Sequence, residues 1–265
     1  MAMLFGLVTL AALALRLVLK LTMIDPETGF YLLEGVGPWP MLFNLLLAAG
    51  VVAAVLWVLR QKPEGGAFAP CRVQGGLTVL SGFAAEVWAI LQVMEQLSGG
   101  KIQLLTLLVA VISIGAGLYL MNLGVGDAAG RQGRGISAAG ASLLILWSVA
   151  VMLSIFLSYS VVVTISDHLL TTLTLVSVVI FLVGYTKLRM GMSGRRAGAQ
   201  TALGGLLGAF FGLSGCLPSL AAGAMGIKEL DTPALFQTLL LLALSLWGGA
   251  AAVGLLVSRP AARKE

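Results

Sequence analysis

The stretch of sequence that decides the fold is TALGGLLGAFFGLSGCLPSLAAGAMG, residues 201–226. It is apolar over its whole length, and a transmembrane helix needs about 20 such residues. Gly204, Gly208 and Gly212 form two overlapping G-x-x-x-G spacings, which place bare backbone along one face of a helix. Because lipid gives helices no hydrophobic reason to associate, they associate through the close packing that small residues allow. We therefore expect a helix surrounded by other helices, with a kink or break at Pro218 in its outer third.

The composition of the whole chain is typical of a membrane protein. Of its 265 residues, 59% are hydrophobic and 10% are charged, and the mean hydropathy is +1.02. Soluble domains carry about 25% charged residues. The apolar residues come in blocks of about 20, which is the length that marks transmembrane helices. The sequence predicts an all-α, polytopic helical bundle that forms a single transmembrane domain over residues 1–265.

Eight apolar blocks follow one another along the chain. Glycine, proline and charged residues separate them and indicate where each predicted helix ends. The predicted helices cover residues 1–23, 39–59, 73–97, 102–122, 136–159, 167–187, 201–226 and 234–257. The first block leaves three alternatives open, because Arg16 and Lys20 follow its apolar part: a full span, a half-span or a helix in the interface. Cleavage as a signal peptide is disfavoured, since no basic segment precedes the apolar residues.

A regular spacing suggests that the helices are arranged as hairpins. Gly76, Gly140 and Gly204 are 64 residues apart (140 − 76 and 204 − 140), each near the start of a predicted helix. Together with the first two helices, this spacing suggests four helical hairpins in series. A parallel internal duplication would produce such a period, and so would a chance agreement of helix and loop lengths.

The basic residues lie mostly on one side of the predicted helices. When the loops are assigned alternately to two sides, one side holds twelve Lys and Arg and the other holds four. The twelve lie in the loops 60–72, 123–135 and 186–199 and in the C-terminal tail. Because cytoplasmic loops carry the excess of Lys and Arg, we expect both termini in the cytoplasm, in a plasma membrane.

The net charge of +5 comes from these loops. Basic residues in short loops between apolar blocks are typical of topology signals, so we expect the lipid bilayer as a partner and no nucleic acid. Two cysteines, Cys71 and Cys216, and one histidine provide no C-x-x-C motif and no set of metal ligands. The sequence also lacks the glycine-rich motifs that bind nucleotides. We expect no cofactor and no metal site.

Glu86 lies near the middle of the helix predicted at 73–97. An ionisable residue at that depth costs several kcal/mol unless it is paired, protonated or hydrated, which makes it a candidate functional residue. Arg16 and Lys20 share a face of the first helix, and Arg16 lies only roughly 5 Å further outward than Glu86. Gln92 continues a polar strip from Glu86, so these four residues form a candidate intramembrane polar site. The alternatives are an ion or substrate site, a structural ion pair, and a protonated, hydrogen-bonded glutamic acid.

Two other motifs suggest catalysis, and each has an alternative. His168 beside Asp167 would suit a proton relay, but Asp167 or the serine before it would also cap the helix that begins there. Residues 212–215, Gly-Leu-Ser-Gly, match the G-x-S-G of rhomboid intramembrane proteases, which take their base from a histidine on a later helix. No histidine follows Ser214, so small residues in a packing helix explain the match better. We therefore assign no catalytic residues.

The segment RLVLKLTMIDPETGFYL, residues 16–32, is followed by a proline and a membrane span. It resembles the start of a group of uncharacterised multi-pass membrane proteins from clostridial gut bacteria. The shared element is the D-x-E-T-G-F turn at residues 25–30. The resemblance implies a bacterial plasma membrane, and it supplies no catalytic residues.

The sequence favours a small transporter or permease-like protein without its own ATPase. The observations behind this hypothesis are a polar strip inside a helix, a glycine-rich helix with a proline, and no catalytic set. The alternative is a structural or regulatory membrane subunit that binds a partner protein or a second copy of the chain. A membrane enzyme is disfavoured, because acid and base groups are few.

Overall fold

The computed structural model of the chain describes residues 1–25, 29–32, 37–63, 71–99, 103–130, 135–158, 166–192, 194–227 and 230–257. These residues form eight helices and no strand, so the expected all-α helical bundle is confirmed. The helices are α1 (Ala2–Thr22), α2 (Trp39–Gln61), α3 (Arg72–Gly99), α4 (Leu104–Ala128), α5 (Ala138–Ser158), α6 (Ser166–Arg189), α7 (Arg195–Ala224) and α8 (Thr232–Val257).

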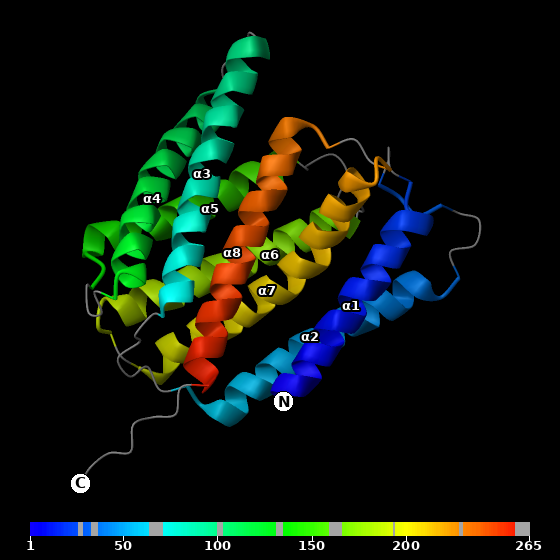
Figure 1. The fold of residues 1–265 in the computed structure, drawn as a ribbon, viewed down its shortest axis with the longest axis horizontal. Coiled ribbons are helices and arrows are strands. Elements are labelled where there is room, and N and C mark those ends of the chain that lie inside the picture. The colour runs from blue at the N-terminus through cyan, green and yellow to red at the C-terminus, as the bar shows by residue number, and fades with distance from the viewer. Residues whose placement is uncertain are drawn as a thin grey trace.

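Helices α6, α7 and α8 form the centre of the molecule (Figure 1). α7 packs between α6 and α8 and also contacts α1 and α2, while α3 contacts α8 and α4, and α5 contacts α4 and α6. The buried apolar side chains form two clusters, one mainly among α3 to α6 and α8, the other mainly among α1, α2 and α7. The glycine-rich helix is thus surrounded by other helices, as its sequence predicted.

The glycines of α7 explain how closely its neighbours approach. A Cβ atom at Gly204 would overlap the backbone nitrogen of Phe181 in α6, and one at Gly205 would overlap the carbonyl oxygen of Gly248 in α8. Gly208, by contrast, leaves 3.7 Å to the nearest side-chain carbon, which is ordinary van der Waals contact. The predicted G-x-x-x-G stripe is therefore not one uniform interface, and Gly205, outside that spacing, makes one of the tightest contacts.

Gly212 makes a third close approach, because a Cβ there would overlap the hydroxyl of Ser245 in α8. Pro218 lies inside α7, which continues to Ala224, so the proline does not break the helix. The three glycines of the 64-residue spacing have different surroundings. Gly76 faces open space, Gly140 contacts the ring of Tyr119, and Gly204 contacts the backbone of α6. The spacing does not mark equivalent packing positions.

Two helix ends differ from the sequence prediction by six residues, and a close helix contact explains one of them. α4 continues to Ala128 rather than ending at residue 122, and α7 begins at Arg195 rather than at 201. Glycines near both ends suggested loops, but in α4 a Cβ at Gly124 would lie 2.6 Å from the carbonyl oxygen of Gly75 in α3. A glycine that lets two helices touch carries the same sequence signal as one that ends a helix.

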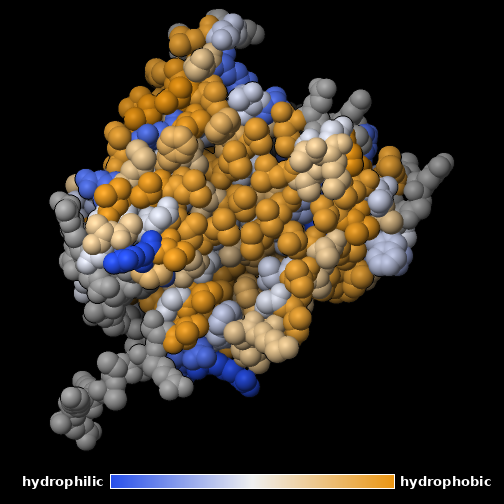
Figure 2. Space-filling view, in the orientation of Figure 1, coloured by the Kyte–Doolittle hydropathy of each residue, from blue (hydrophilic) through white to orange (hydrophobic). Residues whose placement is uncertain are grey.

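The surface is apolar over most of the face seen in Figure 2. Large hydrophobic side chains are exposed on every helix except α7, all of whose residues are described. Each of the eight helices is long and apolar enough to cross a membrane, including α1 with 21 residues. The protein is therefore an integral, multi-pass membrane protein, and the exposed apolar side chains suit contact with lipid.

Candidate functional site

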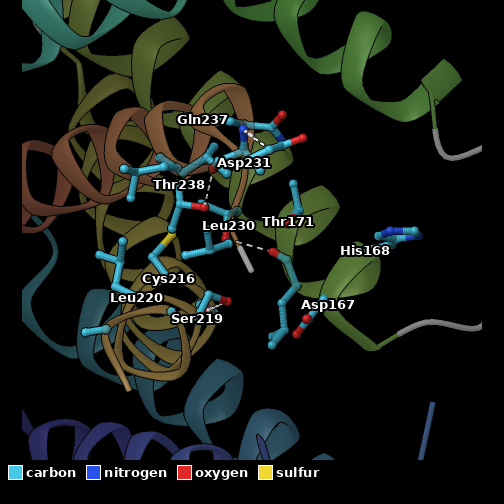
Figure 3. A pocket seen from close by; sticks show the side chains of 18 of the residues that line it. Asp167, His168, Thr171, Cys216, Ser219, Leu220, Leu230, Asp231, Gln237 and Thr238 are labelled. Carbon is cyan, nitrogen blue, oxygen red and sulfur yellow. Dashed lines mark hydrogen bonds between the residues drawn. The ribbon is translucent and has the colours of Figure 1, made fainter. Parts of the chain in front are cut away.

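A pocket of about 1200 Å³ opens between α6, α7 and α8, at the end of the molecule where α6 and α8 begin (Figure 3). We call this end the pocket end. Polar groups on its wall come from all three helices and from the turn before α8: Asp167, His168, Thr171, Thr174, Cys216, Ser219, Asp231, Gln237 and Thr238. Leucines alternate with them, among them Leu170, Leu220 and Leu241. A site of this size and mixed character suits a small solute that has both apolar and polar parts.

The pocket exists because the three central helices touch closely over only part of their length. Towards the end opposite the pocket end, the glycine contacts of α7 bring it against the backbones of α6 and α8. The close approach of Gly212 to Ser245, with Thr174 within van der Waals range, marks where that contact ends. Beyond this level leucine, threonine and glutamine separate the helices, so the space between them opens.

A buried ion cluster forms part of the pocket wall. The Arg16 guanidinium of α1 donates to Asp167 Oδ1 over 2.5 Å, and the Lys20 ammonium donates to Asp167 Oδ2 over 2.7 Å. Lys20 also donates to the Ser219 hydroxyl of α7 over 2.7 Å. The cluster therefore joins α1 to α6 and α7, two consecutive helices that are far from α1 in the sequence.

The cations of this cluster lie behind the carboxylate as seen from the pocket. Arg16 is fully buried and Lys20 is 5% exposed, and neither is among the lining residues. The Asp167 side chain is 21% exposed and faces the pocket. Arg16 also donates to the hydroxyls of Tyr31 and Ser166, and its guanidinium lies 5.3 Å from the centre of the Phe43 ring. Charge-assisted hydrogen bonds of this kind satisfy cations that would otherwise be costly to bury.

Glu86 does not take part in this cluster, so the Arg16–Glu86 pair suggested by depth along the helices does not form. Glu86 packs against Gly117 of α4, and its Oε1 atom is buried without a hydrogen-bond partner among the described residues. Gln92 is six residues, or about one and two-thirds turns, further along α3 and so faces a different side. Of the predicted polar site, the structure brings together only Arg16 and Lys20.

A second buried ion pair lies at the opposite end of α6, which we call the sealed end. Arg189 donates hydrogen bonds of 3.0 to 3.2 Å to both carboxylate oxygens of Asp127, which lies in the last turn of α4. Their side chains are 4% and 2% exposed. The Arg189 guanidinium lies 5.8 Å from the centre of the Tyr185 ring. The backbone carbonyl of Arg189 accepts a hydrogen bond from the N–H of Ile136, just before α5. The pair joins α4, α6 and the approach to α5.

Three acidic or basic partners are absent from the site predicted from the sequence: Asp167, Asp127 and Arg189. The predicted helices end at residues 122 and 187, which leaves Asp127 and Arg189 in loops, whereas these residues lie in the last turns of α4 and α6. Asp167 was interpreted as a helix cap or a relay partner of His168, and instead it binds two cations. One signal was present, since Arg16 and Lys20 share a face and require an acid at the same depth.

The remaining sequence motifs do not assemble a catalytic or metal site in the described residues. The Ser214 hydroxyl is buried and has no hydrogen-bond partner there, so the G-x-S-G match lacks the base that a serine nucleophile requires. Cys71 is exposed and Cys216 is buried, and both thiols are free. No group of three His, Cys, Asp or Glu in this part of the chain is placed to hold a metal ion.

Comparison with known proteins adds no relative. No family model, no curated protein and no solved structure matches this chain. Of the D-x-E-T-G-F turn that carries the clostridial resemblance, residues 26–28 lie outside the described residues. The described part folds back on itself, with Asp25 N–H donating to the Phe30 carbonyl and an antiparallel bridge between Ile24 and Tyr31. This turn places Tyr31 beside Arg16.

Proposed function

We propose that the protein binds a small solute in the pocket between α6, α7 and α8 and carries it across the membrane without an ATPase of its own. The observation that supports this most is the pocket itself, about 1200 Å³ with polar groups from three helices and a carboxylate in its wall. Polar and ionisable residues within membrane helices are costly, and in such proteins they mark solute pathways and binding sites.

The structure of the sealed end supports a transporter rather than an open channel. Phe181, Tyr185 and Trp247 pack with ring centres 5.0 to 5.5 Å apart, and all three are buried. Gly205 and Gly248 bring α7 and α8 into backbone contact next to them. A pocket that opens at one end and is closed by packed side chains at the other corresponds to one state of an alternating-access cycle.

Thiol labelling tests whether water reaches the pocket from one side only. With Cys71→Ser and Cys216→Ala as background, Thr171→Cys places a thiol on the pocket wall (Figure 3). Ser177→Cys, on the same helix but 3% exposed, is the matched control. We expect a membrane-impermeant thiol reagent to label Thr171→Cys and to leave Ser177→Cys unlabelled. Failure to label Thr171→Cys from either side would contradict a solute pocket.

Transport itself is tested with a solute library. Compounds that raise the melting temperature of the purified protein are offered to proteoliposomes, and uptake is measured for wild type and for Thr171→Trp. The indole would occupy part of the pocket beside Asp167, so we expect both the thermal shift and the uptake to fall. Uptake that persists in Thr171→Trp would place the pathway elsewhere.

We also propose that the protein lies in a bacterial plasma membrane with both termini in the cytoplasm, which makes the pocket end face outward. The twelve-to-four distribution of basic residues supports this orientation, and the clostridial resemblance supports the bacterial plasma membrane. Reporter fusions after Lys62, Arg134 and Arg196 should all report cytoplasm. A signal from the outer side at any two of them would reject the orientation.

A second proposal, a structural or regulatory subunit, is favoured by one feature. Towards the pocket end α3 and α4 extend beyond the other helices (Figure 1), and Met94, Leu97 and Leu104 there are exposed. A partner helix or a second copy of the chain would cover this face. Purification from native membranes in mild detergent separates the two proposals, since a stoichiometric partner supports the subunit and a monodisperse single chain supports the transporter.

A further inference from the structure

We propose that the pocket takes solutes that carry a primary ammonium group, and that Lys20 occupies the ammonium position when no solute is bound. This inference rests on the proposed solute-binding function and names the class of solute.

The position is defined by two oxygen atoms on the pocket wall. Asp167 Oδ2 and Ser219 Oγ each lie 2.7 Å from Lys20 Nζ, so together they already coordinate one ammonium group. Asp167 and Ser219 both line the pocket, whereas Lys20 approaches them from the other side. A solute in the pocket therefore meets the two acceptors, and its ammonium group would make the same hydrogen bonds that Lys20 makes now.

Arg16 and Lys20 play different parts in this site. Arg16 is fully buried and fixes Asp167 through Oδ1, while two further hydroxyls hold its guanidinium in place. Lys20 binds the other oxygen through a flexible chain that carries a compact charge. Lys20 also lines a small cavity together with Asp25 and Asp167, so a second carboxylate lies near the lysine. Exchange of one ammonium for another leaves the charge beside Asp167 unchanged.

An anionic solute fits the pocket less well. Among the described lining residues the acids are Asp167 and Asp231, and there is no lysine or arginine. The amino-terminal ends of α6 and α8 attract anions in general, but each already carries its own carboxylate. Asp167 lies in the first turn of α6, and Asp231 Oδ1 accepts the Ala234 N–H at the start of α8 over 2.9 Å.

The rest of the pocket suits the aliphatic part of an amine. Leu170, Leu220 and Leu241 provide apolar wall on three different helices, and Thr171 and Thr238 also line the pocket. The substrate class is therefore an amphipathic primary amine, whose nitrogen binds beside Ser219 and whose carbon chain packs on the leucines.

The test removes the internal ammonium and supplies an external one. Lys20→Ala leaves Asp167 Oδ2 and Ser219 Oγ without their ammonium, and n-propylammonium is the probe. At about ten times its dissociation constant, it should raise the melting temperature of Lys20→Ala by about 3 °C. Propanol and propionate should not. Adding Ser219→Ala to Lys20→Ala should weaken propylammonium binding about fivefold, because one acceptor is lost.

Lys187→Ala is the matched control, because it removes a lysine near the sealed end of α6 that donates to Gln200. At the same concentration propylammonium should raise its melting temperature less than that of Lys20→Ala, because Lys20 still competes for Asp167 and Ser219. If Lys20→Ala yields no folded protein alone, the readout is the amount of monodisperse protein purified in the presence of propylammonium. Recovery supports the inference, and no recovery overturns it.

The outcomes separate this inference from the proposed function. No thermal shift with propylammonium, or an equal shift with propanol or propionate, overturns the ammonium site. If Thr171→Cys is still labelled by the impermeant reagent in that case, the pocket remains a solute site for another class of compound. If Thr171→Cys is not labelled, both the inference and the transport proposal fail.

Discussion

Asp167 and Asp127 each bind an arginine from another helix, but their surroundings differ. Asp127 is 2% exposed, and Arg189 holds both of its oxygens within a packed aromatic region. Asp167 is 21% exposed, and two cations from α1 share its oxygens at the edge of a pocket. An aspartate–arginine pair thus fixes helices at both ends, and at the pocket end its carboxylate also forms part of the pocket wall. The two ends differ in the exposure of the aspartate and in the lysine that binds Asp167 alone.

The largest expected effect comes from breaking the pair at the sealed end. Asp127→Asn leaves the Arg189 cation buried without a full counter-charge and should reduce the free energy of unfolding by about 3–5 kcal/mol. Denaturant unfolding in detergent micelles measures this loss. The double variant Asp127→Asn with Arg189→Met removes both charges and should recover most of it. If the single variant is as stable as wild type, the pair does not hold the sealed end together.

The next effect comes from the helix contacts that close the sealed end. Gly205→Ala places a methyl group of α7 against the Gly248 carbonyl of α8. Because neither helix backbone can move easily, the free energy of unfolding should fall by about 1–3 kcal/mol. Gly208→Ala has 3.7 Å of room and should be neutral or stabilising by about 0.5 kcal/mol, since alanine favours the helix. Thermal unfolding of the two variants side by side checks this. Equal losses would mean that α7 packs as the uniform stripe expected from its sequence.

A smaller effect on stability is expected at the pocket end. Asp167→Asn removes the carboxylate shared by Arg16 and Lys20, but water from the pocket reaches this position. We expect a loss of about 1–2 kcal/mol, less than for Asp127→Asn, because exposure of the carboxylate to water weakens the pair and because Tyr31, Ser166 and Ser219 still accept hydrogen bonds from the two cations. The same variant should lose all response to propylammonium. A loss larger than that of Asp127→Asn would reverse the comparison between the two ends.

The smallest effect is expected at Glu86, which belongs to neither end. No described cation pairs with it, and its Oε1 atom accepts no hydrogen bond in the described residues, so Glu86→Gln removes no ion pair. The change in unfolding free energy should stay below about 1 kcal/mol. A loss of several kcal/mol would reveal a partner outside the described residues.

The helical class, the number of spans and the central place of α7 were predictable, because the bilayer imposes length and hydropathy on every span. The partners of Arg16 were not predictable in the same way. Depth along the helices suggested Glu86, and only the packing of α1 on α7, next to α6, shows that Asp167 is the partner. Pairing between helices depends on which faces meet, and hydropathy carries no information about that.

Glycine caused the other differences, since its role depends on what lies opposite. Gly124 and Gly205 are adjacent to other helices' backbones, and Gly76 to open space. In the sequence all three have the same signature. The pocket could not be predicted from the sequence either, because its volume depends on how far α6 and α8 diverge from α7. Ser219 and Thr171 on its wall give no signal, since such residues are common in apolar helices.

The distance in sequence between Lys20 and Asp167, 147 residues, has a consequence for how the protein is made. A ribosome adds roughly 5–20 residues per second, so two cations of the first helix are synthesised roughly ten seconds before the acid that pairs with both of them. During that interval a fully inserted α1 would carry unpaired charge in the bilayer, which is costly. We expect α1 to stay at the membrane surface or beside the insertion machinery until α6 and α7 emerge. The last part of the chain would then decide when the first part enters the membrane.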